Sequence, residues 1–183
     1  MMAADIPQLQ RAIADAARQA FAEIRAAHPG EAFYAFALYT DDDVMTIAAA
    51  ANSEEGLRRK LAERGETDPA EVALMRWNTA EWACEAAGDE HFDAPCELLR
   101  NLAGNLFGKG FARFKEQVHR AIVGALGDLE KEGLFGQGGE RGRVTVFASI
   151  PGSDDAPALE NESARALNPS EVYARFVRRH MPG

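Results

Sequence analysis

The sequence has little of several features that define common classes of protein. It contains two cysteines, Cys84 and Cys96, with no CxxC pair, so it indicates neither a disulfide framework nor a thiolate metal cluster. Its longest apolar runs, such as 44–51, fall well short of the roughly 20 residues that a membrane helix needs. The opening residues MMAADIPQLQ lack the basic and apolar regions of a signal peptide. We therefore expect a cytoplasmic protein with reduced thiols and no membrane insertion.

Basic residues are also scarce, with 20 Lys and Arg against 29 Asp and Glu. The formal charge of −9 repels a phosphate backbone unless the basic residues gather on one face. The densest basic groups, at 58–60 and 175–179, each lie on a predicted helix, where a solvated polar face explains them. Nucleic acid is therefore not an expected partner.

The composition present is that of a chain with a packed core. Hydrophobic residues make up 46% of the 183 residues and charged residues 27%, which argues against disorder. A chain of this length has one domain by default, because two would each bury too little surface. We predict a single globular domain over 1–183.

Two long amphipathic helices stand out in the pattern of apolar residues. Apolar side chains recur at helical spacing over 5–27, and a second stripe covers about 111–132 at spacings of three and four. Shorter helices are predicted where capping residues occur, after Asn52 and after Asn168, and over 97–106.

Four segments are interpreted as strands, at 33–40, 44–51, 71–77 and 144–150. The 71–77 segment also fits a helix at this length, and we interpret it as a strand. The first two must be antiparallel neighbours, because the residues between them are too few for a crossover. These elements predict an α+β fold with a mainly antiparallel sheet of about four to six strands packed by helices.

Three consecutive aspartates, Asp41, Asp42 and Asp43, join the first two predicted strands. Aspartate tolerates turn conformations and can bond its own backbone, so a hairpin loop accounts for all three. A calcium loop would need oxygen ligands at alternating positions, a central glycine and a distal glutamate, and the sequence does not have them. We expect no metal and no cofactor.

Other motifs fail as catalytic signatures. The glycines of GNLFGKG do not have P-loop spacing, and no two histidines share an i, i+4 spacing. His119 borders the apolar stripe of the long helix, where a half-buried structural histidine is the simpler account, and His91 in DEHFD is assigned to a solvated loop. Ser149 and Ser153 lie outside any GxSxG elbow, and Cys84 has no obvious histidine partner. We predict no catalytic residues.

Tryptophan is rare, and both tryptophans lie in the segment RWNTAEW. Arg76 and Glu81 each directly precede one of the tryptophans, Trp77 and Trp82, and such a tryptophan pair can anchor a core or form an aromatic binding surface. We predict that Trp77 faces the core and that Trp82 is partly accessible at the edge of the sheet.

Several of these segments together resemble a bacterial family known as domain of unknown function 4303. The segments are FYAFALYTDDD, the helix start at 52–55, RWNTAEW, and the late pairs Glu162-Ser163 and Leu167 to Pro169. The resemblance covers most of the chain and implies no particular activity or catalytic residue. In size and acidity such small α+β families are similar to immunity proteins of bacterial toxin systems.

Two hypotheses of function follow from these observations. The first is a non-catalytic protein-binding module of immunity or adaptor type, whose partner is another protein. The alternative is an enzyme or small-ligand-binding protein with a site near the 41–43 loop and the 76–82 segment. The candidate binding residues are Tyr39, Asp41, Asp42, Asp43, Arg76, Glu81 and Trp82. The sequence gives no indication of oligomeric state.

Overall fold

The centre of the molecule is a four-stranded sheet with strand order β3-β2-β1-β4, seen in a computed structural model that describes residues 5–104 and 106–180. Its strands are β1 (Phe33–Thr40), β2 (Ile47–Ser53), β3 (Cys84–Glu85) and β4 (Thr145–Ser149). β2 pairs antiparallel with β1 and β3, whereas β4 pairs parallel with β1. The α+β class is thus confirmed with four strands, but the sheet is mixed rather than antiparallel throughout.

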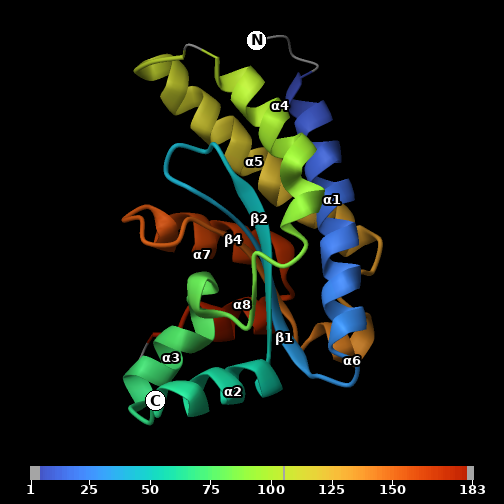
Figure 1. Ribbon diagram of the computed structural model, residues 1–183, viewed down its shortest axis with the longest axis vertical. Helices are drawn as coiled ribbons and strands as arrows, with labels where there is room; N and C mark the ends of the chain where they lie inside the picture. The colour runs from blue at the N-terminus through green and yellow to red at the C-terminus, as the bar shows by residue number, and fades with distance from the viewer. Residues whose placement is uncertain (1–4, 105, 181–183) are drawn as a thin grey trace.

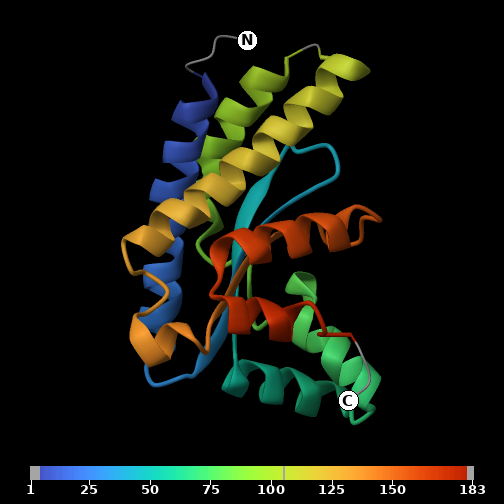
Figure 2. The same ribbon diagram turned by 180° about the vertical axis from the view of Figure 1, so that it is seen from behind.

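Helices cover both faces of this sheet (Figures 1 and 2). One face carries α1 (Asp5–Ala27), η2 (Asp89–Phe92), α4 (Asp93–Ala103) and α5 (Lys109–Lys131). The other carries α2 (Glu54–Arg64), α3 (Pro69–Trp77), η1 (Thr79–Glu81) and α8 (Ser170–Phe176). The remaining helices are α6 (Gly138–Arg141) and α7 (Ala156–Leu167), and α7 lies beside β4. Over the described residues, no helix combines the length and apolarity needed to cross a bilayer.

The predicted hairpin of the first two strands is confirmed. β1 and β2 pair from Phe33 opposite Ser53 to Thr40 opposite Ile47, and both strands are buried on both faces. Phe36 and Leu38 face α1 and α5, as expected for a strand covered from both sides. The second strand begins later than predicted because Val44 belongs to the turn, with a φ of 49°.

Two predicted elements need correction. The segment interpreted as a strand at 71–77 is the helix α3, whose start is set by Asp68, because its carboxylate accepts from the N–H groups of Ala70 and Glu71. Pro69 at the first helical position strengthens this start. In addition, no helix is predicted between the strand at 144–150 and the helix after Asn168, but α7 begins at Ala156 and carries Ser163 and Leu167 into the core.

The two long helices agree with the sequence. α1 covers the predicted 5–27, and α5 begins two residues before the predicted 111 and buries its apolar stripe against α1. Their crossing is close: a Cβ at Gly124 would lie 2.5 Å from the side-chain oxygen of Gln10. The glycine in α5 therefore leaves room for the end of the Gln10 side chain between the two helices.

The outer edge of β4 is closed by side chains. The amide of Asn168 accepts from the N–H of Val146 at 2.8 Å and donates to its carbonyl oxygen at 2.7 Å. Ser163 on α7 accepts from the N–H of Ala148 at 2.9 Å. Because an amide side chain offers both a donor and an acceptor, Asn168 replaces a neighbouring strand at this edge.

Candidate binding groove between α5 and α7

A groove of about 590 Å³ lies between α5 and α7. The helices are close where Gly127 faces Leu167, and they separate toward their N-termini (Figure 2). Val123, Ile150 and Leu159 form an apolar floor, and the exposed Ala158 also lines the groove. Charged residues surround this floor, namely Lys115, Glu116, Arg120, Asp155 and Glu162.

The helical repeat explains why these residues share the groove. On α5 the groove residues 115, 116, 119, 120 and 123 follow i, i+3 and i, i+4 spacings, so they form one face. This face lies beside the buried stripe that contains Phe114 and Val118. α7 contributes a matching face through 158, 159, 162 and 163. Both walls of the groove are therefore rigid helices.

Lys115 connects the groove to the aspartate loop. Its Nζ lies 3.6 Å from Asp42 Oδ1 and 3.5 Å from Asp155 Oδ2, and Asp42 also accepts from the Ser153 hydroxyl at 2.7 Å. The ammonium group of Lys115 therefore lies between two carboxylates, and its side chain is only 22% exposed. Of the predicted binding residues, Asp42 thus contacts a lysine of the groove, although it does not line the groove itself.

His119 lies on the groove face of α5 and is half-buried. Its Nε2 is shielded from solvent and has no hydrogen-bond partner among the described residues. Burial lowers the pKa of the imidazole, and the neighbouring Lys115 lowers it further, while Asp155 acts in the opposite direction. The neutral ring is therefore the stable form at neutral pH.

This pKa shift predicts a contribution to pH-dependent stability. Because the folded pKa of His119 is lowered, the unfolded chain binds the proton more readily, so stability is lost as the pH falls below about 6.5. We expect His119→Gln to reduce the difference in unfolding free energy between about pH 7 and pH 5. Lys115→Met should raise the pKa of His119 in an NMR titration. An unchanged pKa in that variant would contradict the role of Lys115.

The rest of the aspartate loop is a turn, as predicted. Asp41 accepts from the N–H groups of Asp43 at 2.9 Å, Met45 at 3.1 Å and Thr46 at 2.8 Å. Partial burial alone would raise the pKa of Asp41, but these bonds and that of the Thr46 hydroxyl outweigh it and lower the pKa. The Asp41 carboxylate is therefore used by the loop itself. Asp43 is exposed.

Three other predicted binding residues are engaged in local pairs. Tyr39 is half-buried, and its hydroxyl donates to the carboxylate of Glu85. Arg76 forms an ion pair with Glu54, and Glu81 forms one with Arg64; both partners lie on α2. These pairs fasten β1 to β3, α3 to α2, and η1 to α2.

The prediction that Trp82 is partly accessible is wrong. Trp82 is 1% exposed, and its ring packs against Phe147 with centroids 5.7 Å apart. Its indole N–H donates to the carbonyl oxygen of Arg76, which also accepts from the hydroxyl of Tyr34. Because α3 is a helix that ends at Trp77, the turn after it folds Trp82 back under the sheet. Trp77 is the less buried of the two.

The loop at 41–43 and the segment at 76–82 do not form one site. Arg76 lies against Tyr34 near the start of β1, with its guanidinium carbon 4.2 Å from the ring centroid, whereas the loop follows Thr40 at the end of that strand. About six residues of strand separate them by roughly 20 Å. Figure 1 shows α3 and this loop at opposite ends of β1.

Comparison with known proteins places this structure in a family. A family model described as Domain of unknown function (DUF4303) matches residues 13–169. The chain belongs to this family. Neither the curated proteins nor the solved structures gave a match. The DUF4303 match contains the whole sheet and both helices of the groove, and it ends before α8.

The segments by which the sequence resembles DUF4303 have structural roles in this chain. Asn52 donates to the Tyr34 hydroxyl at 2.9 Å and its side-chain oxygen accepts from the N–H of Ala83. RWNTAEW supplies Trp82 to the core, and the late residues Ser163 and Asn168 close the edge of β4. In this DUF4303 protein the resemblance therefore lies in the framework of the sheet.

The groove itself escaped sequence reasoning. The sequence predicts a structural role for His119, Lys115 lies in no motif, and Glu162 contributes to the family resemblance without indicating a site. The sequence analysis does not predict α7. Leu159, Ser163 and Leu167 recur at i, i+4 spacings, and this pattern could have indicated the helix. Without that helix, the groove face of α5 has no opposite wall.

Proposed function

We propose that this DUF4303 protein is a non-catalytic protein-binding module of immunity or adaptor type in bacteria, and that its partner protein docks in the groove between α5 and α7. The observation that carries the proposal is the apolar floor of Val123, Ile150 and Leu159 within a rim of charged residues. Protein interfaces have this anatomy, with a dry apolar centre and a polar surround.

The rim suits a partner with charges of both signs. Arg120 and Glu116 are both 72% exposed in their side chains and lie 3.7 Å apart. An exposed pair of this kind contributes little to folding, so each member can exchange its partner at low cost. Glu162 and Asp155 add negative charge from the opposite wall. Paired charges across the rim would then fix the orientation of the partner.

The hydroxyl of Ser163, which lines the groove, has a structural role. Ser163 accepts from the N–H of Ala148 at 2.9 Å and lies 3.2 Å from the carbonyl oxygen of Glu160. A serine nucleophile instead needs a base within hydrogen-bonding reach. Ser163 thus serves the edge of β4.

A small ligand is the second candidate, and the volume of the groove favours it. Small-molecule sites measure about 300–1,000 Å³, and the groove falls in that range at about 590 Å³. Such a ligand would lie on Leu159 and Val123 and pair with Lys115 or Arg120.

Site-specific photo-crosslinking in the native host would test the proposal. We expect a photoreactive residue at Ala158, which is exposed in the groove, to give one discrete crosslinked protein, and one at Arg11, exposed on α1, to give none. The purified partner should then lose at least tenfold in affinity with Leu159→Asp. Native mass spectrometry of the purified protein tests the alternative. A bound mass of a few hundred daltons, with no crosslinked protein, would contradict the proposal and favour the small ligand.

A further inference from the structure

We propose that Glu23, Glu90 and His91 bind a divalent transition-metal ion, with Zn²⁺ as the best fit, and that the ion fastens η2 to α1. This site lies apart from the groove and does not depend on the proposed function. Among the described residues these three side chains are the group that brings metal-binding atoms together, all within 4.8 Å of one another.

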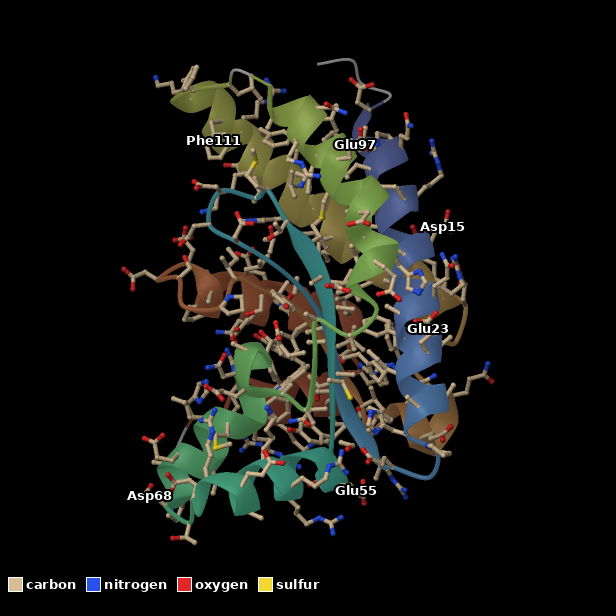
Figure 3. The ribbon with its side chains drawn as sticks, in the orientation of Figure 1. Asp15, Glu23, Glu55, Asp68, Glu97 and Phe111 are labelled. Carbon is tan, nitrogen blue, oxygen red and sulfur yellow. The ribbon has the colours of Figure 1, made fainter. Side chains whose placement is uncertain are left out.

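Close packing of η2 on α1 creates the site. Gly88, with a φ of 71°, precedes η2 and lies so near Ala20 that a Cβ at Gly88 would be 3.0 Å from the Cα of Ala20. One turn further along α1, Glu23 then faces His91 across the contact. Figure 3 shows Glu23 on α1 beside the segment that leads into α4. The backbone thus fixes the distance between the two sets of ligands.

The separation of the atoms fits ligands of one ion. His91 Nε2 lies 2.8 Å from Glu23 Oε1. Two atoms held about 2.1 Å from an ion, at angles of roughly 90° to 110°, lie about 3.0–3.4 Å apart. A shift of a few tenths of an ångström would therefore admit a cation between the imidazole and the carboxylate.

The orientation of His91 also indicates a shared ion. Its Nε2 is shielded from solvent, yet it makes no hydrogen bond of acceptable geometry with any described residue, although Glu23 Oε1 is near. The carboxylate oxygen must therefore lie away from the direction of the ring N–H, where a hydrogen bond is weak. Two ligands of one metal ion need no such alignment, because each is directed at the ion.

The ligand types select the class of metal. One imidazole nitrogen and two carboxylates suit Zn²⁺ and its neighbours, whereas Mg²⁺ and Ca²⁺ prefer oxygen alone. The side chain of Glu23 is 57% exposed and that of His91 is 18% exposed, so water can complete the coordination. With a neutral imidazole, the two carboxylates leave a local charge that a divalent cation neutralises.

From the sequence, DEHFD is interpreted as a solvated loop before a helix, which accounts for the carboxylates around His91. Glu90 and His91 are adjacent in the chain, but Glu23 comes from α1 far earlier. The site exists only once η2 packs on α1, so no spacing rule could have found it.

Calorimetry on the chelator-treated full chain tests the site with Zn²⁺ alone. We expect one ion to bind with a Kd of about 1–100 µM at neutral pH. His91→Gln and Glu23→Gln should each weaken binding at least tenfold. His28→Gln is the matched control. His28 also lies near a carboxylate, 3.5 Å from Glu31, but it does not belong to the group of Glu23, Glu90 and His91. The His28→Gln variant should therefore bind Zn²⁺ as the parent does.

Circular dichroism and amide hydrogen exchange separate loss of the metal site from loss of the fold. The exposed Glu23 can be changed with little risk to folding, and circular dichroism confirms that each variant is folded. On Zn²⁺ addition, amide hydrogen exchange should slow in 88–92 and in α1 around Glu23. Binding that is equal in the parent, His91→Gln and Glu23→Gln would overturn the proposal, as would a parent Kd weaker than about 1 mM.

Discussion

Replacing Asn168 with leucine is expected to lower the free energy of unfolding by about 3 kcal/mol, because it leaves several backbone groups without partners. The Asn168 amide bonds both the N–H and the carbonyl oxygen of Val146, and its nitrogen also donates to the carbonyl oxygen of Ala164 at 2.8 Å. Leucine has a side chain of the same branched shape, but it is bulkier and offers no hydrogen bond. The loss therefore reports the missing polar contacts together with the cost of accommodating the two methyl groups.

Arg141 adds to the expected loss. It is 6% exposed, and its guanidinium donates to the carbonyl oxygens of Val144 and Leu167 as well as to Asn168 Oδ1 at 3.1 Å. Glu130 pairs with this arginine at 2.8 Å. In Asn168→Leu, the guanidinium of Arg141 loses one of its hydrogen-bond acceptors. Losing a hydrogen bond to a nearly buried charged group costs more free energy than losing one between neutral groups.

Urea unfolding followed by circular dichroism measures the loss, with Asn101→Leu as the control on the exposed side of α4. The control should change the free energy by no more than about 0.5 kcal/mol. The opened edge of β4 should also promote association of the Asn168 variant, since an unpaired strand edge can pair with another chain. A loss below about 1 kcal/mol would show that water replaces the amide at this edge.

The sequence contained what was needed for the hairpin and the long helices. Apolar residues on both alternating faces of 33–40 indicated a buried strand, and a loop of a few polar residues allowed only an antiparallel partner. The apolar stripe at 111–132 was long enough to exclude other assignments. In each case the local pattern and the tertiary packing require the same structure.

Elsewhere the local pattern did not decide. AEVALMRW fits both the strand and the helix period, and the Asp68-Pro69 cap made it helical. The parallel pairing of β4 with β1 depends on the long route through α5, which residue patterns do not encode. The groove needed α7, and the group of Glu23, Glu90 and His91 needed η2 on α1. Sites of this kind arise from packing between distant segments.

The misplacement of Trp82 followed from the same ambiguity. With 71–77 as a strand, Trp77 continued the core-facing positions and Trp82 fell beyond the edge of the sheet. Because α3 is a helix, its last carbonyl groups have no partner within the helix. The indole N–H of Trp82 donates to one of them, the carbonyl oxygen of Arg76, at 3.0 Å. The carbonyl oxygen of Arg76 accepts from both the Tyr34 hydroxyl and the Trp82 indole, so tryptophan, with an N–H on a large apolar ring, fits this position.

Trp82→Ala is expected to lower the free energy of unfolding by about 3–5 kcal/mol, the range for removing a large buried aromatic side chain. Trp82→Phe keeps a ring against Phe147 but loses the bond to Arg76, so it should cost less. Trp77→Ala should also cost less than Trp82→Ala, at about 1–3 kcal/mol, since Trp77 is only half-buried between Tyr34 and Phe176. Circular dichroism is the suitable probe, because each change alters the fluorescence.

Iodide quenching then tests the two burial states directly. In Trp77→Phe the fluorescence comes from Trp82, which is 1% exposed, so iodide should quench it very little. In Trp82→Phe the remaining Trp77 should be quenched more strongly. If iodide instead quenched Trp82 as strongly as Trp77, and Trp82→Ala cost less than about 1 kcal/mol, the indole would have to lie at the surface. The aromatic surface predicted at Trp82 would then become available for a partner, and the carbonyl oxygen of Arg76 would keep only its bond from the Tyr34 hydroxyl.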